Sequence, residues 1–70
     1  MQRSLTRLAE LRYQHRYSVR TLARRAGVAY SRLSDYERGG LVPTLKVQAR
    51  IARALDVAPE DIWPPAEARR

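Results

Sequence analysis

The sequence predicts an all-α domain of five short helices around one shared core. Apolar residues recur at helical spacing in several short segments, and no segment shows the apolar and polar alternation of a strand. Glycine or proline separates the later segments, at Gly27, at Gly39-Gly40 with Pro43, and at Pro59. A chain of 70 residues forms one small domain, with a net stability expected to be on the order of 5 kcal/mol or less. Every helix must therefore contribute to the same core.

The first helix is expected to begin after Ser4 and to end at Tyr13 or Gln14. Its apolar stripe contains Leu5, Leu8, Leu11 and Arg12. Because Arg12 lies on this stripe, a charged side chain is expected to face inward.

A second helix is expected over about Val19 to Ala26, with Ser18 as its N-cap. Its inward residues are Val19, Leu22, Ala23 and Ala26. Gly27 ends this helix, because glycine readily adopts the left-handed backbone that follows many helices. Val28 is expected to be buried beside the turn. A third helix, over about Tyr30 to Arg38, carries Leu33, Tyr36 and Glu37 on one face.

Thr44 is expected to cap a fourth helix after the break at Gly39 and Gly40. The apolar stripe of this helix contains Leu45, Ala49, Ile51, Ala52 and Leu55. Asp56 follows it where a glycine is usual, which predicts a left-handed aspartate. A short fifth helix opens at Pro59, and Ile62 and Trp63 supply its apolar contacts. The domain is predicted to span residues 1–63, and residues 64–70 to form a polar C-terminal tail.

Two inward-facing charges of opposite sign, Arg12 and Glu37, are expected to pair. An unpaired buried charge costs several kcal/mol, so an ion pair between the first and third helices is the simplest arrangement. The alternative is two solvated charges at the edges of their stripes.

The charge balance indicates a nucleic-acid partner. Lys and Arg number 14 against 7 acidic residues, the net charge is +7, and the estimated pI of 11.1 is typical of a nucleic-acid-binding domain. Residues 1–28 account for +6 of this charge. The alternative is an ordinary solvated surface in a chain whose coding sequence favours arginine.

Several classes of protein are excluded by what the sequence lacks. Without cysteine there is no disulfide and no thiolate zinc site, and we expect neither a metal nor a cofactor. A single histidine, His15, without a glycine-rich phosphate loop or clustered carboxylates, argues against an enzyme. No apolar run approaches the roughly 18 residues of a membrane span, and no signal peptide is apparent. A cytoplasmic protein without membrane contact is expected.

The spacing of several short motifs resembles the phage-repressor and Cro-like helix-turn-helix proteins, the XRE type. The resemblance spans about Leu5 to Ile62. The motifs are Leu22-Ala23, Gly27-Val28, Leu33, Tyr36-Glu37-Arg38-Gly39, Pro43-Thr44-Leu45 and Ile51-Ala52-Arg53-Ala54-Leu55. It implies a lambda-repressor-like fold in which the second and third helices form the helix-turn-helix. In that family the positions matching Arg12 and Glu37 also pair.

The resemblance implies that the third helix enters the major groove of double-stranded DNA with its N-terminal residues on base edges. The base-reading positions are matched by Tyr30, Ser31 and Asp35, with Ala29 and Ser34 beside them. Asp35 can accept a hydrogen bond from cytosine N4. The alternative makes Tyr30 and Ser31 helix-start residues only, and makes Asp35 an i,i+3 partner that orients Arg32.

Phosphate contacts are expected from basic residues around this helix, namely Arg20, Arg32, Arg38 and Lys46. The sequence departs from the family pattern on this side. Val19 replaces a usual glutamine, Ala29 a usual hydroxyl N-cap, and residues 40–42 a usually basic loop.

These inferences predict a sequence-specific transcriptional regulator of the repressor type. It would bind a pseudo-palindromic operator as a homodimer, with half-sites roughly 34 Å apart. Ile62 and Trp63 match the family's usual dimer region, although Trp63 suits a lid on the monomer's own core equally well. The alternative function is a protein-interaction module or antitoxin that binds a protein through Leu41, Val42 and Trp63. The sequence does not distinguish a phage repressor, a restriction-modification controller and an antitoxin.

Overall fold

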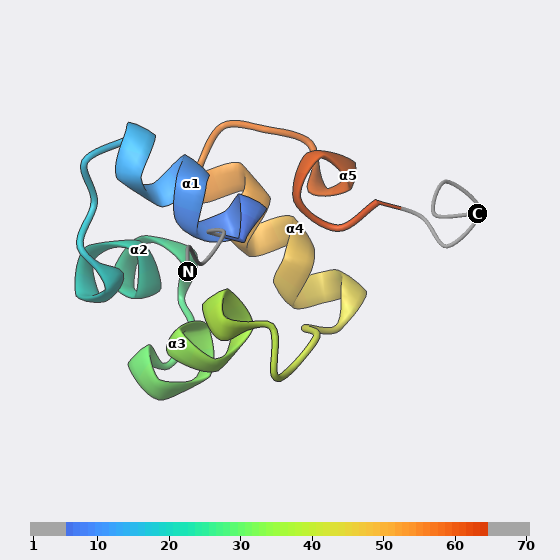
Figure 1. Ribbon diagram of the computed structural model, residues 1–70, viewed down its shortest axis with the longest axis horizontal. Helices are drawn as coiled ribbons and strands as arrows, with labels where there is room; N and C mark the ends of the chain where they lie inside the picture. Colours follow the sequence, from blue (N-terminus) through green and yellow to red (C-terminus); the bar gives the residue numbers. More distant parts are fainter. Residues whose placement is uncertain (1–5, 65–70) are drawn as a thin grey trace, which may run out of the picture.

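Five helices follow one another in the computed structural model, which describes residues 6–64 (Figure 1). They are α1 (Arg7–Gln14), α2 (Val19–Ala26), α3 (Tyr30–Arg38), α4 (Leu45–Ala54) and α5 (Pro59–Ile62). The predicted all-α class is confirmed. Leu5 and residues 65–70 of the predicted polar tail lie outside the described residues.

Hydroxyl side chains cap the first, second and fourth helices. Thr6 has an extended backbone and accepts a hydrogen bond from the Ala9 amide at 3.2 Å. Helix α1 therefore begins at Arg7, and the predicted start after Ser4 was wrong, because Thr6 is a second residue able to cap. The predicted caps at Ser18 and Thr44 are confirmed.

Helices α1 to α4 all end in the same backbone motif. Behind each one a residue adopts a left-handed conformation, and the next amide donates to a carbonyl five residues earlier. The left-handed residues are Arg16 (φ 61°), Gly27 (φ 70°), Gly39 (φ 79°) and Asp56 (φ 60°). The prediction for Asp56 is confirmed. Arg16 was not predicted, because arginine carries no sequence signal for this conformation.

The core lies where α2 packs against α3 and α4, while α1 contacts α3 and α5, and α4 contacts α5 (Figure 1). The fully buried side chains include Leu8, Leu22, Leu33, Ile51 and Leu55. Val28, predicted to be buried, is half-buried against this core. Each helix therefore contributes a few residues to one small core.

The inward stripe of α4 differs from the prediction. Ile51, Ala52 and Leu55 are buried as expected, but Leu45 is 81% exposed and Ala49 is also exposed. One turn before Ile51 the inward position belongs to Val47, which is half-buried. Placing Leu45 on the buried stripe was wrong: it shares a side of the helix with buried Ala52, seven residues on, but it is the first residue of α4, and the core-facing residues of α4 begin at Val47.

His15 ties the end of α1 to the end of α4. Its Nε2 lies 2.8 Å from the Leu55 carbonyl oxygen, to which it donates, and its ring stacks on Tyr17 with centroids 5.2 Å apart. The bond satisfies one of the carbonyls that a helix leaves free at its C-terminus. Within residues 6–64, the helices are all too short or too polar to cross a membrane.

Candidate nucleic-acid interface

A sharp turn sets α3 across α2. The Gly27 backbone is left-handed, and the Val28 amide donates to the Ala23 carbonyl at 2.9 Å. A β-carbon at Gly27 would meet no atom within 4 Å, so its conformation and not lack of space favours glycine. Ala23 is 4% exposed, and its small side chain allows the two helices to approach. The turn and the close packing of α2 and α3 set the angle between these two helices.

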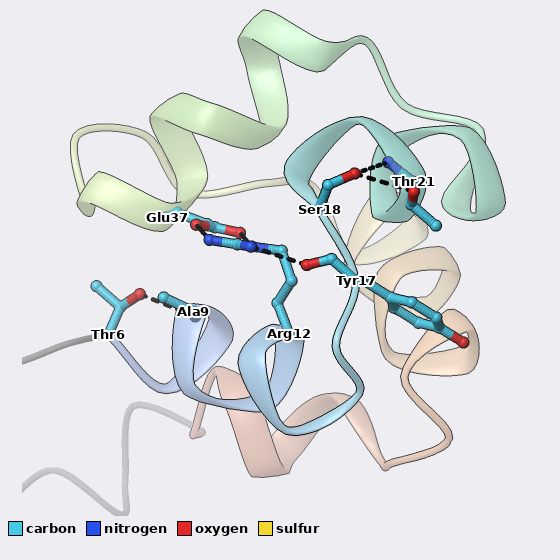
Figure 2. A network of polar contacts seen from close by, with 7 residues as sticks. All are labelled: Thr6, Ala9, Arg12, Tyr17, Ser18, Thr21 and Glu37. Atoms are coloured by element: carbon cyan, nitrogen blue, oxygen red, sulfur yellow. Dashed lines mark hydrogen bonds and ion pairs between the residues drawn. The ribbon is translucent and has the colours of Figure 1, made fainter.

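Arg12 holds together the three segments that position α3 (Figure 2). Its Nε and Nη2 donate to the two carboxylate oxygens of Glu37 at 2.5 and 3.1 Å, and its Nη1 donates to the Tyr17 carbonyl at 2.9 Å. The two charged side chains are 9% and 11% exposed. One guanidinium thus joins α1, the segment before α2 and the last turn of α3.

The hydrogen bond to Glu37 is the main reason why the pKa of Arg12 is raised above its ordinary value, against the opposing effect of burial. A raised pKa on a base adds stability that is lost only when pH rises through the folded-state pKa. Arg12 is therefore charged throughout the range in which proteins are usually studied, and its contribution to stability does not change with pH there.

The outer side of α3 carries the predicted base-reading residues. Ala29, Tyr30 and Ser31 are exposed, and Ser34 and Asp35 are half-exposed. As expected from its lack of a hydroxyl, Ala29 makes no side-chain cap to the helix. Leu33 and Tyr36, on the opposite side, are 0% and 7% exposed. Helix α3 therefore has a buried apolar side packed into the core and a largely polar side exposed to solvent.

Asp35 pairs with Arg38, at 2.5 Å between Oδ1 and Nη2. The alternative that Asp35 orients Arg32 was wrong. Both arginines stand three residues from Asp35, but an acid that precedes its base in a helix is favoured by the helix dipole. The pair brings a candidate base reader and a candidate phosphate contact together, and it offsets a negative charge that DNA phosphates would otherwise repel.

Replacing Asp35 with asparagine is expected to shift base preference at one operator position from cytosine toward adenine. A carboxylate accepts from cytosine N4, whereas an amide both donates and accepts and so suits adenine. Sequencing of DNA bound from a random pool would measure the shift. Asp56→Asn is the matched control, because it makes the same charge change in an exposed residue outside α3. If the Asp35→Asn variant selects the same sequence as the wild type and binds all DNA more tightly, Asp35 only neutralises Arg38.

All four predicted phosphate-contact residues are exposed, namely Arg20, Arg32, Arg38 and Lys46. One of them has a contact that the sequence did not reveal. The guanidinium carbon of Arg20 lies 4.9 Å from the centre of the Tyr30 ring. The two residues are ten apart in sequence, and only the turn between α2 and α3 brings them together. No spacing rule for a single helix would have found this pair.

A second surface is apolar, and we call it the Trp63 face: Leu41, Val42, Leu45 and Trp63. Leu41, Val42 and Leu45 are 41%, 71% and 81% exposed. Trp63 is half-buried and lines two adjoining grooves, one with Leu45 and the other with Leu41 and Val42. Ile62, predicted beside Trp63 as a dimer contact, is 7% exposed and belongs to the monomer's core. Leu45 was missed because it was assigned to the inward stripe.

Comparisons with known proteins agree with this arrangement. A family model described as "Helix-turn-helix" matches residues 8–62. Among solved structures, the restriction-modification controller protein C.AhdI from Aeromonas hydrophila superposes with a TM-score of 0.77 at 36% sequence identity. The match covers 80% of this chain and 85% of that one. No curated protein matches the chain significantly.

Proposed function

We propose that this chain, which belongs to the XRE-type helix-turn-helix family and is a DNA-binding transcription regulator, recognises a specific operator through α3 in the major groove. The observation that carries the proposal is the outer side of α3. Tyr30, Ser31 and Asp35 lie there on a helix whose other side is packed into the core. Because the backbone of α3 is already ordered by this packing, meeting base edges requires no further loss of backbone conformational entropy on binding.

Phosphate contacts from Arg32, Arg38 and Lys46 would hold α3 in register on the duplex. Each is exposed, and Arg38 is oriented by Asp35. Arg20 was also predicted to contact phosphate, but its contact with the Tyr30 ring sets it apart from these three residues. These groups are suited to binding DNA and not to catalysis. We place the protein in the cytoplasm, associated with the nucleoid through its DNA.

A homodimer on a pseudo-palindromic operator is the form we propose, since a single domain offers few base contacts. The Trp63 face supplies the surface. Val42 and Leu45 are among the most exposed large apolar residues between positions 6 and 64, and burying them against a second copy removes that surface from water. The operator would then carry two half-sites roughly one helical turn, about 34 Å, apart.

Replacing Leu45 with serine is expected to shift the protein from dimer to monomer while leaving its melting temperature nearly unchanged. The side chain is 81% exposed, so it contributes little to the monomer's core. Sedimentation velocity over a concentration series measures the oligomeric state. Ala49→Ser is the control, since Ala49 is an exposed residue of the same helix that lies outside the Trp63 face. A wild type that stays monomeric at high concentration without DNA would contradict a preformed dimer.

The similarity to C.AhdI favours the control of restriction and modification genes as the biological setting. We propose regulation of the repressor type, in which the bound operator blocks transcription. A methyltransferase gene and a nuclease gene beside this one would support the setting, and a toxin or integrase gene would point to an antitoxin or a phage repressor. The exposed Val42 and Leu45 also suit a partner protein, which is the second candidate function.

Selection of bound duplexes from random DNA, followed by footprinting of the enriched site, tests the proposed function. The expected result is an inverted repeat whose half-sites are protected together. A reporter gene placed behind that site should be silenced by the wild-type protein. Failure to enrich any sequence over background would exclude a sequence-specific regulator.

A further inference from the structure

We propose that Arg20 reads a guanine and that Tyr30 holds its guanidinium in place, so that the two residues form one base-reading unit. This inference rests on the proposed function and assigns one base of the half-site. It also changes the predicted role of Arg20 from a phosphate contact to a base contact.

The first argument is the position of the two groups. Tyr30 is the first residue of α3, and Arg20 is the second residue of α2. The guanidinium carbon lies 4.9 Å from the centre of the exposed Tyr30 ring. Because the N-terminal residues of a recognition helix face base edges, a group held against Tyr30 faces them too. Base pairs are stacked about 3.4 Å apart, so the ring and the guanidinium would meet neighbouring base pairs.

The second argument is that, among residues 6–64, the hydrogen-bond donors of Arg20 have no carboxylate or carbonyl partner. Among residues 6–64, the arginines paired with carboxylates are Arg7, Arg12 and Arg38. Arg20 is not among them, and its one described side-chain partner is an aromatic ring. A cation over a ring face uses none of its N–H donors in hydrogen bonds to carbonyl or carboxylate oxygens, so the donors of Arg20 remain available to a base.

The third argument is chemical. Guanine presents two acceptors in the major groove, O6 and N7, and an arginine edge donates to both at once. A phosphate can also accept two N–H bonds from an arginine edge, so this chemistry alone does not separate the two roles. What favours base reading is the position of Arg20 beside Tyr30, the first residue of α3.

Sequences selected from random DNA by the wild type, Arg20→Ala and Arg20→Lys test the assignment. The wild type should enrich a half-site with one invariant guanine. Both variants should enrich the same half-site with that single position degenerate, because lysine keeps the charge but lacks the two-donor edge. Tyr30→Phe should keep the guanine preference, and Tyr30→Leu should weaken it. Melting temperatures of all variants establish that they are folded.

A direct measure is the exchange of that guanine for 7-deazaguanine, which lacks the N7 acceptor. Because O6 remains, wild-type affinity should fall by about 5-fold to 10-fold for each half-site, and Arg20→Ala should bind both duplexes equally. Variants that enrich the same guanine and merely bind all DNA more weakly would overturn the assignment and return Arg20 to the phosphates. A wild type that enriches no sequence would overturn the proposed function and this inference together.

Discussion

Replacing Glu37 with alanine is expected to lower the free energy of unfolding by about 3 to 5 kcal/mol. Arg12 is only 8% exposed, and the substitution removes the carboxylate that pairs with it. An unpaired buried charge lowers the stability of a folded protein more than most single changes do. A domain of this size has on the order of 5 kcal/mol in total. Urea denaturation monitored by circular dichroism should therefore show a protein that is largely unfolded or close to it at 37 °C.

Two control variants separate the lost pair from other effects. Glu10→Ala breaks the ion pair with Arg7, whose side chains are 49% and 46% exposed, and should change stability by less than about 1 kcal/mol. The double variant with methionine at positions 12 and 37 removes both charges and should recover much of the loss. Recovery will be incomplete, because the Tyr17 carbonyl loses its donor. A Glu37→Ala protein as stable as the wild type would contradict the role of this pair.

The affinity for the operator is expected to fall by about 10³-fold or more when salt rises from 50 to 200 mM. Arg32, Arg38 and Lys46 of two protomers would neutralise about six phosphates, and each contact releases counterions into solution. The slope of log K against log salt should then be roughly −5. Fluorescence anisotropy with a labelled operator duplex measures it.

Removal of Lys46 tests the source of that slope. Lys46→Ala should make it less steep by about 2 for a dimer, with similar weakening on operator and random DNA. Arg53→Ala is the matched control, because Arg53 is an exposed base in the last turn of the same helix and is not expected at the DNA. A slope near zero in the wild type would favour the protein-interaction module over the regulator.

Local signals in the sequence were enough to predict most of the fold. Ser18 and Thr44 cap helices, and Gly27 ends one, through hydrogen bonds and backbone angles within a few residues. Capping and turn rules therefore placed α2, α3 and α4 correctly. The pairing of Arg12 with Glu37 could be inferred because burial of either charge alone is so costly. The start of α1 was predicted wrongly, because the prediction rested on Ser4 and did not consider Thr6, which is the N-cap.

The remaining features depend on how the helices pack. Whether Leu45 faces the core or solvent depends on how far along α4 the other helices pack, which a stripe of small and apolar residues does not specify. The contact between Arg20 and Tyr30 and the bond from His15 to the Leu55 carbonyl join residues 10 and 40 positions apart. Such contacts follow from the turn angles of the whole domain. Arg16 adopts a left-handed backbone that its side chain does not favour.

Dimethyl sulfate protection of the enriched operator tests the central claim most directly, because the reagent methylates guanine N7 in the major groove. If α3 lies in that groove, the protein should protect guanine N7 atoms in both half-sites, about one helical turn apart. Protection in each half-site should include the guanine assigned to Arg20. If hydroxyl-radical footprinting shows the protein bound while every guanine N7 remains reactive, α3 does not read DNA through the major groove.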